Sequence, residues 1–497
     1  MSRAKPRPAE GSITGSATRG SDFLQLTIAD APAGGRAEWL AGQLRLAISD
    51  GRLPVGSRLP ATRVLAADLE VSRGVVTEAY QRLVEDGHVA GRGRGGTVVV
   101  AVPVAAPTVR TYQPPSTADV FATDPADDVF DSFRAAAARF DLSPGVPDLA
   151  AFPRSAWLRA ERTVFNAVEP AALGYGDPRG TPALRLAVAT WLARTRGIRV
   201  DPAEVLIVAG VAQALGLVAK VLSEDGITQI AVEDPGSLGV RQHLRNAGME
   251  TPPVPVDDAG LRVDVLRDSG VGAVMMTPAH QFPTGVVLDG ERRRQLMRWD
   301  GLIVEDDYDA EHRYDRPPVS ALRSMVSERV FYAGSVSKLL APALRVGWLL
   351  VPARYRDAVI AAKRLADLGN AALPQLVLAE LMSSGELERQ LRYLRRRHVR
   401  RRDAMVDAVH AHLPGAVVHG AAAGLHLMIT LDTPRSDVDL AAAALRHGVK
   451  VQPLSWHCQR PHPPGLILGY AANTPSDIAA GVATIGRAIR AVRQRRA

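Results

Sequence analysis

The sequence of 497 residues is long enough for two to four domains rather than a single core. It contains no apolar run of about 18 residues and no apolar leader segment, so we expect neither a transmembrane helix nor a secretory signal. The single cysteine, Cys458, excludes internal disulfides and multi-cysteine zinc sites and favours the cytoplasm, while the net charge of +8 suits nucleic acid or anionic ligands.

Composition and hydrophobic pattern divide the chain into four stretches. Residues 1–22 are rich in Gly, Ser, Pro and Arg, which predicts a disordered tail. Residues 23–100 form a compact helical pattern, and residues 101–139 carry several prolines without periodicity, which predicts a linker. Residues 140–497 alternate short apolar runs with helix-length segments, which predicts an α/β domain with a small subdomain from about residue 375.

Two apolar repeats at helical spacing begin the first module. Leu40, Leu44 and Ile48 predict a helix that ends before Gly51. After a turn, a second helix passes through Leu65 and continues for about one more turn.

A third helix is predicted from Arg73 to Glu85, with Ser72 as its N-cap. At its N-terminus the exposed face of this helix carries small and polar residues, and this is the end at which a recognition helix contacts base edges. A basic, Gly-rich turn then leads to a strand at Val98–Val100 and completes a β-hairpin wing. The residues expected on the buried face of the helix are Val75, Val76, Ala79, Leu83 and Val84.

Several phrases of this module keep an unbroken spacing, namely Gly56–Pro60, Ala66–Leu69, Val71–Arg73, Ala79–Leu83 and Glu85–Gly87. The pattern resembles the winged helix-turn-helix of GntR-type transcription regulators. The resemblance implies binding to a double-stranded DNA operator, with salt-dependent contacts from arginines to phosphates and base readout by the third helix. The residues at positions where the family touches DNA are Arg63, Ser72, Arg73, Thr77, Arg92 and Arg94.

The apolar runs of residues 140–497 lack strict alternation, as expected of strands that are buried on both faces. The amphipathic segments between them predict a mostly parallel sheet with helices on both faces. The runs are Val205–Val208, Ile230–Val232, Ala273–Met276, Leu302–Val304, Val330–Tyr332 and Val346–Val351.

Side chains with complementary chemistry follow several of these runs. Open α/β sheets bind ligands at the carboxyl ends of their strands, so we expect Lys338, Asp306, Tyr308 and Arg345 at one edge. Pyridoxal phosphate requires such a set: a lysine for a Schiff base, a carboxylate for the pyridine nitrogen, and hydroxyls with an arginine for the phosphate. The neighbour Asp307 points to the opposite face of a strand, which favours one functional carboxylate over a Mg²⁺ site.

The order and spacing of these groups across residues 140–495 resemble the fold-type I aminotransferases. The phrases Thr277–Gly285, Glu305–Asp309 and Ser337–Pro342 carry the resemblance. Together with the GntR-type module, the chain is identified as a member of the MocR family of regulators. The resemblance implies a homodimer that binds pyridoxal 5'-phosphate.

The same resemblance assigns roles to individual residues. It implies that Lys338 is the Schiff-base lysine, that Asp306 holds the pyridine nitrogen and that Tyr308 contacts the phenolic oxygen. Tyr175 matches the entrance motif of the family and would come from the dimer partner. The implied phosphate-binding residues are Ser335, Ser337 and Arg345, with Ala212 and Gln213 at a helix N-terminus.

Two positions depart from the family pattern. Ser237 stands where an aromatic residue often stacks on the cofactor ring, which leaves His280 or Phe282 as candidates for that role. Ile467 stands where aminotransferases carry the arginine that grips the substrate carboxylate. Loss of that charge-assisted contact argues against efficient transamination of amino acids.

Two other groups of residues suggest weaker alternatives. His457, Cys458 and His462 include metal-ligand types, but prolines crowd their loop and no second cluster completes a site. The arginine-rich run 389–402 has the character of an acid-binding patch, although a solvated helix of the small subdomain is the simpler interpretation.

We therefore expect a cytoplasmic transcription regulator whose large domain binds pyridoxal phosphate, senses an effector and dimerises. Because the carboxylate arginine is missing, the chain resembles members that respond to pyridoxal phosphate itself and control vitamin B6 synthesis. One alternative is an active aminotransferase with a DNA-binding appendage. Another is a regulator that senses a small amino compound by forming a Schiff base with it, without turnover.

Overall fold

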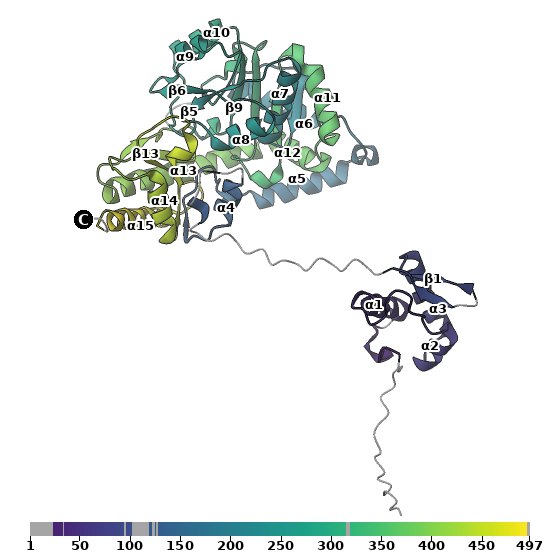
Figure 1. Cartoon of the computed structure of the whole chain (residues 1–497). Helices are drawn as coiled ribbons and strands as arrows, with labels where there is room; N and C mark the ends of the chain where they lie inside the picture. The colour runs from purple at the N-terminus through teal and green to yellow at the C-terminus, as the bar shows by residue number, and fades with distance from the viewer. Residues whose placement is uncertain are drawn as a thin grey trace, which may run out of the picture. The chain divides into compact units, whose positions relative to one another are not determined.

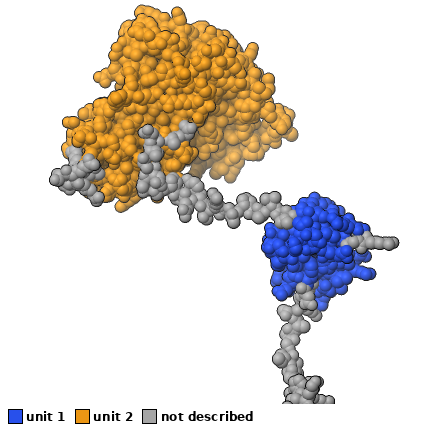
Figure 2. Space-filling view, viewed as in Figure 1, with its two compact units in different colours: residues 1–113 blue, residues 114–497 orange. Residues whose placement is uncertain are grey.

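The computed structural model describes residues 23–32, 34–93, 96–101, 119–121, 125, 128–314 and 319–494. The chain divides into two compact units, residues 1–113 and residues 114–497 (Figure 2). The predicted tail, residues 1–22, and residues 102–118 of the predicted linker lie outside the described part. Among the described helices, none combines the length and the apolar character needed to cross a membrane.

The described part of the first unit contains three α-helices and a two-stranded antiparallel hairpin, as predicted (Figure 1). Leu40, Leu44, Leu65 and Leu83 are almost fully buried and join the helices into one small core. The elements are α1 (Arg36–Ser49), α2 (Thr62–Asp68), α3 (Arg73–Glu85), β1 (Val89–Gly91) and β2 (Thr97–Val99).

The buried face of α3 differs from the prediction at one edge. Val76, Ala79 and Leu83 are buried as expected, but Val84 is 48% exposed and Tyr80 is buried in its place. At 3.6 residues per turn Tyr80 lies about 40° round the helix from Val76, still on the core side, whereas Val84 lies about 80° from Val76 in the same direction. Ser72 occupies the N-cap position, but its side chain makes no capping hydrogen bond.

An eight-stranded sheet forms the centre of the second unit (Figure 1). Its order is β4-β11-β10-β9-β8-β5-β6-β7, and β11 runs antiparallel to both neighbours while β8, β9 and β10 pair in parallel. The predicted mostly parallel sheet is confirmed. The strands are β4 (Val205–Val208), β5 (Ala231–Asp234), β6 (Pro253–Asp257), β7 (Gly260–Leu261), β8 (Ala273–Met276), β9 (Leu302–Asp307), β10 (Val330–Ser335) and β11 (Gly347–Leu350).

Helices cover both faces of this sheet, because alternate residues of its strands are apolar on both sides. One buried cluster joins Leu206 and Val208 to α7 and α11, and another joins Val205 and Ile207 to α6 and α12. The helices of this region are α5 (Arg154–Ala167), α6 (Pro182–Thr195), α7 (Val211–Glu224), α8 (Leu238–Asn246), α9 (Val263–Asp268), α10 (Gly290–Arg298), α11 (Arg356–Asp367) and α12 (Ala372–Ser383).

A smaller antiparallel sheet, of order β12-β13-β16-β15, packs with the C-terminal helices in a separate core. The remaining pair, β3 with β14, is parallel. These elements are β3 (Phe140–Asp141), β12 (Val417–His419), β13 (His426–Thr430), β14 (Val449–Lys450), β15 (Gln452–Pro453), β16 (Gly465–Gly469), α4 (Val129–Ala135), α13 (Glu386–His412), α14 (Asp437–Arg446) and α15 (Pro475–Gln494).

The small core changes two of the predicted boundaries, the end of the linker and the start of the small subdomain. Phe121 and Phe133, from the stretch predicted to be linker, are buried with the C-terminal helices. The Phe121 ring stacks on Trp456, and the Phe133 ring meets Trp456 edge-on. At the other end, the expected subdomain start near residue 375 falls inside α12, whose Leu378 and Met382 belong to the core of the large sheet. The small core therefore combines both ends of the second unit.

Candidate functional site

A cavity of about 720 Å³ lies at the carboxyl ends of the central strands. Asp306 comes from β9, Ser335 from β10 and Gly210 from the turn between β4 and α7. Because these strands run in the same direction, their carboxyl ends meet at one edge. The structure thus brings together side chains from distant parts of the sequence, at the edge where the sequence predicted them.

Lys338 lines this cavity from the loop after β10. Its Nζ donates to the carbonyl of Gly145, and its own carbonyl oxygen lies 3.2 Å from Nε2 of His312. Burial lowers the pKa of the Lys338 ammonium, against the opposing effect of Asp309 and Asp306. Burial therefore favours the neutral amine, which is the nucleophilic form.

Asp306 presents an unsatisfied carboxyl oxygen to the cavity. Its Oδ1 is buried and has no hydrogen-bond partner in the described part of the chain. Burial, reinforced by Asp307 and Asp309, raises the pKa of the Asp306 carboxyl to about 8. A buried carboxylate of this kind calls for a cationic or hydrogen-bond-donating partner in the cavity.

Asp307 points away from the cavity, as the strand alternation predicted. Its carboxylate accepts hydrogen bonds from Arg196 and Tyr332, which are both fully buried. The two adjacent carboxylates therefore have separate surroundings, and only Asp306 lines the cavity.

One end of the cavity is built to receive an anion. Ser335, Ser337 and Arg345 line it, together with Val211 and Ala212, the first two residues of α7. Gly210, the N-cap, has a φ of +85°, and a Cβ there would lie 3.4 Å from a guanidinium nitrogen of Arg345. A helix N-terminus with hydroxyls and a guanidinium is the usual surrounding of a bound phosphate.

Tyr308 lines the cavity, but His280 does not. His280 is 2% exposed and lies behind Tyr308, with Nδ1 3.0 Å from the Tyr308 hydroxyl and 2.9 Å from Oδ2 of Asp309. Of the two candidates for stacking on a ring, the structure therefore places only Phe282 at the cavity wall. Ser237 also lines the cavity, and its hydroxyl caps α8 at the amide of Val240.

Beside Phe282, His426 and His457 also line the cavity, a position that the sequence did not predict for either residue. The Phe282 ring lies 4.9 Å from that of His426 and 5.0 Å from that of His457. Burial lowers the pKa of each imidazole to about 3, so both are neutral. His426 is on β13 of the small sheet, and no local motif marks it; only the packing of the small sheet brings it to the cavity.

Two residues assigned by resemblance lie outside the cavity lining. The Gln213 side chain accepts from the amide of Ala209 at 2.8 Å and donates to Asp367 at 2.7 Å. Tyr175 is 96% exposed and follows the short 3-10 turn at Pro170–Leu173. Neither reaches the cavity within one copy of the chain.

The arginine-rich helix α13 is not simply a solvated helix. Arg397 and Arg401 each place a guanidinium nitrogen 2.7 Å from Oδ2 of Asp148, which is buried. This pair anchors the segment that precedes α5 to α13. His457 and Cys458 belong to no metal-binding group of three or more ligand side chains within the described ranges.

The first unit presents an exposed face around the N-terminus of α3. Arg63, Ser72, Arg73 and Thr77 are exposed there, and Arg92 is exposed at the hairpin. Arg73 Nε donates to the Thr62 hydroxyl at 3.3 Å. None of the three arginines has an acidic partner within the described part of the chain, while Arg94 lies outside it.

These two units define a class of protein, a transcription regulator in which a winged helix-turn-helix is joined to a fold-type I aminotransferase fold. Residues 36–99 match the family of bacterial regulatory proteins called gntR, and residues 139–485 match aminotransferase class I and II. The chain belongs to the MocR-type family of HTH regulators that combines these two domains.

Similar proteins include regulators and enzymes. The chain is 32% identical over 467 residues to the probable rhizopine catabolism regulatory protein MocR of Rhizobium meliloti, covering 90% of this chain and 93% of that protein. It is 31% identical to the pyridoxine biosynthesis regulator PdxR of Corynebacterium glutamicum, covering 84% and 87%. The alpha-aminoadipate aminotransferase of Thermus thermophilus, solved with N-(5'-phosphopyridoxyl)-L-leucine, superposes with a TM-score of 0.66 at 26% identity, covering 76% and 97%.

Proposed function

We propose that this chain is a DNA-binding regulator whose second unit binds pyridoxal phosphate in the cavity and senses an effector there. The observation that carries the proposal is the unpartnered, buried Oδ1 of Asp306, which shares one cavity with the Lys338 amine. An anion-receiving end with Arg345 completes the set. The relatives' domain architecture supports the same assignment.

The residues present fit this cofactor group by group. Lys338 is a half-buried amine, Asp306 has a buried carboxyl oxygen with no hydrogen-bond partner among the described residues, and Ser335, Ser337 and Arg345 suit a phosphate. When bound, pyridoxal phosphate supplies an aldehyde that reacts with amines and a pyridine ring that withdraws electrons. A protonated ring nitrogen is the partner that the buried Asp306 carboxylate lacks.

The cavity favours pyridoxal phosphate over an amino acid as the effector. Ile467 is fully buried among Met428, Leu454 and Phe282, so no cation occupies the place of the usual carboxylate arginine. The neutral His426 imidazole supplies no positive charge there either. We therefore propose a sensor of pyridoxal phosphate that controls vitamin B6 synthesis, as the name of the relative in Corynebacterium glutamicum suggests for that protein.

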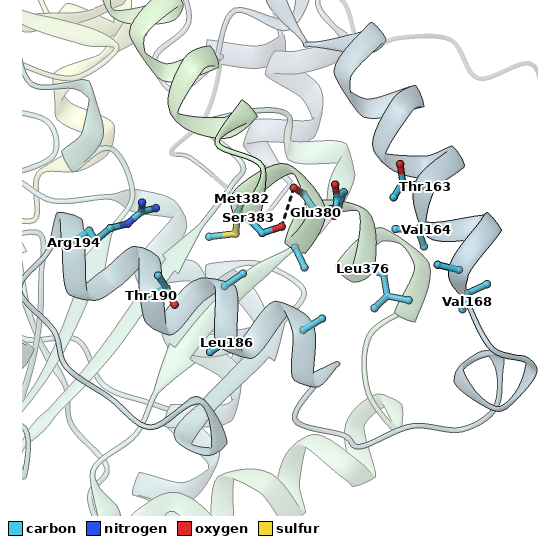
Figure 3. A pocket seen from close by; sticks show the side chains of 14 residues that line it. Thr163, Val164, Val168, Leu186, Thr190, Arg194, Leu376, Glu380, Met382 and Ser383 are labelled. Carbon is cyan, nitrogen blue, oxygen red and sulfur yellow. Dashed lines mark hydrogen bonds between the residues drawn. The ribbon is translucent and has the colours of Figure 1, made fainter.

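A second copy of the chain is proposed to complete the site. Helix α5 buries only Ala160, and its exposed side chains include Leu158 and Phe165. Beside it, a mostly apolar groove of about 550 Å³ is lined by residues of α5, α6 and α12, with Val164, Leu186 and Leu376 around it (Figure 3). Apolar surface of this kind marks an interface. A homodimer also matches a DNA-binding module that reads a short half-site.

Subunit complementation tests the dimer and the role of Tyr175 together. We expect Tyr175→Ala and Lys338→Ala each to weaken or abolish the cofactor absorption band. Mixed dimers of the two variants contain one site with Lys338 of one protomer and the partner's Tyr175, and should regain the band in part. No recovery in a proven mixed dimer would contradict the shared site.

The central experiment compares wild-type protein and Lys338→Ala with added pyridoxal phosphate. We expect a visible absorption band in the wild type that is lost in the variant. Operator duplexes selected from a random pool by the purified protein then serve to compare DNA affinity with and without pyridoxal phosphate. Equal affinity in both conditions would contradict the sensor role.

The two rival functions predict different results with amino acids. Multiple turnover with an amino acid and a 2-oxoacid would indicate an aminotransferase with a DNA-binding appendage. A spectral shift on adding an amino acid, without product, would indicate a regulator that senses a small amino compound. Absence of both supports pyridoxal phosphate as the effector.

A further inference from the structure

One face of the small sheet contributes an uncharged amide to the cavity, beside the position of Ile467. Gln452 pairs with Ile467 across β15 and β16, and Met428 pairs with Ile467 from the other side. Residues directly opposite each other in an antiparallel pair carry their side chains on the same face of a sheet. Gln452 lines the cavity, whereas Ile467 packs against Phe282 and does not reach the lining.

One end of the Gln452 amide is held by the protein. Its Oε1 lies 3.1 Å from Nε2 of His457, and the amide of Leu238 donates to Nδ1 of the same imidazole at 3.3 Å. Burial lowers the pKa of His457 to about 3, against the opposing effect of the Gly236 backbone, so the ring is neutral and carries one proton. With the Leu238 amide directed at Nδ1, that proton lies on Nε2 and is donated to Gln452.

The other end of the Gln452 amide faces the cavity without a partner. Among the described residues, none accepts a hydrogen bond from its Nε2, and Gln452 is only 6% exposed. A ring proton of His457 directed at Gly236 instead would leave the oxygen of Gln452 free in place of the nitrogen. In both arrangements the free end is an uncharged polar group that calls for a hydrogen-bond partner in the cavity.

The cations of the cavity wall do not serve this part of the cavity. The lysine and arginine side chains in the described lining belong to Arg134, Lys338 and Arg345. The Arg134 side chain is 70% exposed and pairs with Asp131, while Lys338 and Arg345 belong to the groups proposed for the cofactor itself. A carboxylate beside Gln452 would therefore lose its hydration without gaining a cation, which is costly in a buried site.

We propose that this wall is a second binding compartment, in which Gln452 recognises an uncharged polar group of an amino compound bound beside the cofactor. The inference rests on the proposed binding of pyridoxal phosphate, and it names the class of compound that the cavity takes in addition. A carboxamide is the best match, because it offers both a donor and an acceptor to the Gln452 amide. An amino acid matches less well, since its carboxylate finds no cation there.

Stable conjugates of the cofactor test the compartment without any reaction at Lys338. The three probes are pyridoxamine 5'-phosphate, N-(5'-phosphopyridoxyl)-L-alaninamide and N-(5'-phosphopyridoxyl)-L-alanine. The first lacks the group in question, and the other two differ only in having a carboxamide or a carboxylate. Calorimetry on the full chain, freed of bound cofactor by hydroxylamine and dialysis, gives the three dissociation constants.

We expect the wild type to bind the carboxamide conjugate about tenfold more tightly than the carboxylate conjugate. Gln452→Met keeps the length of the side chain but removes its polar end. It should weaken binding of the carboxamide conjugate about tenfold and leave pyridoxamine 5'-phosphate unchanged. Gln452→Arg places a guanidinium at the cavity wall and should reverse the preference in favour of the carboxylate conjugate. The exposed Gln81→Met in the first unit is the matched control and should change none of the three constants.

The results separate failure of the inference from failure of the proposed function. If pyridoxamine 5'-phosphate does not bind to the wild type, the proposed function fails and the inference fails with it. If it binds but the wild type does not prefer the carboxamide, or if Gln452→Met weakens all three probes equally, the inference alone is wrong. Should Gln452→Met not fold, as judged by circular dichroism, Gln452→Asn takes its place. Asn withdraws the amide by one carbon, so the carboxamide conjugate should again bind more weakly, and an unchanged affinity would contradict the contact.

Discussion

Asp306→Asn is expected to stabilise the ligand-free protein, and to do so more as the pH rises. Burial raises the pKa of the Asp306 carboxyl from 3.8 to about 8 in the folded chain. The folded state therefore keeps this proton over a pH interval in which the unfolded chain has lost it. The free energy of unfolding of the wild type falls as the pH rises through that interval. Asn has no proton to lose and lacks this penalty.

The magnitude follows from the width of the interval. Each pH unit between the two pKa values contributes about 1.4 kcal/mol. The variant should therefore gain about 3 kcal/mol relative to the wild type between about pH 5 and pH 7, and little more above about pH 8. Added pyridoxal phosphate should stabilise the wild type more than the variant, since it supplies the missing partner of the carboxylate.

Urea unfolding followed by tryptophan fluorescence measures the effect, because every tryptophan except Trp39 lies in the second unit. Burial also raises the pKa values of Glu233, Glu305 and Glu311 to about 7, but these groups contribute to both proteins and cancel in the difference. A difference between variant and wild type that does not change with pH would refute the reasoning that Asp306 lacks a partner in the ligand-free cavity.

Further predictions concern packing and the anion end of the cavity. Leu83→Ala should lower the free energy of unfolding of the first unit by about 2–5 kcal/mol, because it removes a side chain from the core of that unit. We expect calorimetry to show the first unit unfolding at a lower temperature and DNA binding to weaken. The absorption band that depends on Lys338 should stay unchanged. Asp148→Asn should cost about 3–5 kcal/mol because it leaves two guanidinium groups without their buried anion, and unaltered urea unfolding would contradict this. Gly210→Ala should lower the affinity for pyridoxal phosphate roughly tenfold through about 1–2 kcal/mol of backbone strain beside Arg345, as measured by titration of the absorption band. Arg73→Ala should make the slope of log DNA affinity against log salt concentration shallower by about one unit, the contribution of one phosphate contact, without changing thermal stability. An unchanged slope would show that Arg73 does not contact the DNA.

Short-range patterns were sufficient for most elements of the fold. Helix α1 was predicted from the helical repeat of Leu40, Leu44 and Ile48, and strands β4 and β8 from the apolar runs Val205–Val208 and Ala273–Met276. Such elements can be predicted because the spacing of apolar residues along the sequence shows which side chains are buried. The exposed Val84 and the buried Tyr80 show where the pattern loses resolution, at the edge of a helical face.

The sequence by itself predicted which side chains gather at one edge of the large sheet, since Asp306 and Ser335 stand at the carboxyl ends of neighbouring parallel strands and Lys338 follows shortly after. Only the tertiary structure decided which side chains support them. His426 reaches the cavity from the small sheet, His280 lies behind Tyr308 beside Asp309, and Asp148 is held by Arg397 and Arg401. These contacts join segments separated by up to hundreds of residues, and their formation depends on packing between layers that no local spacing encodes.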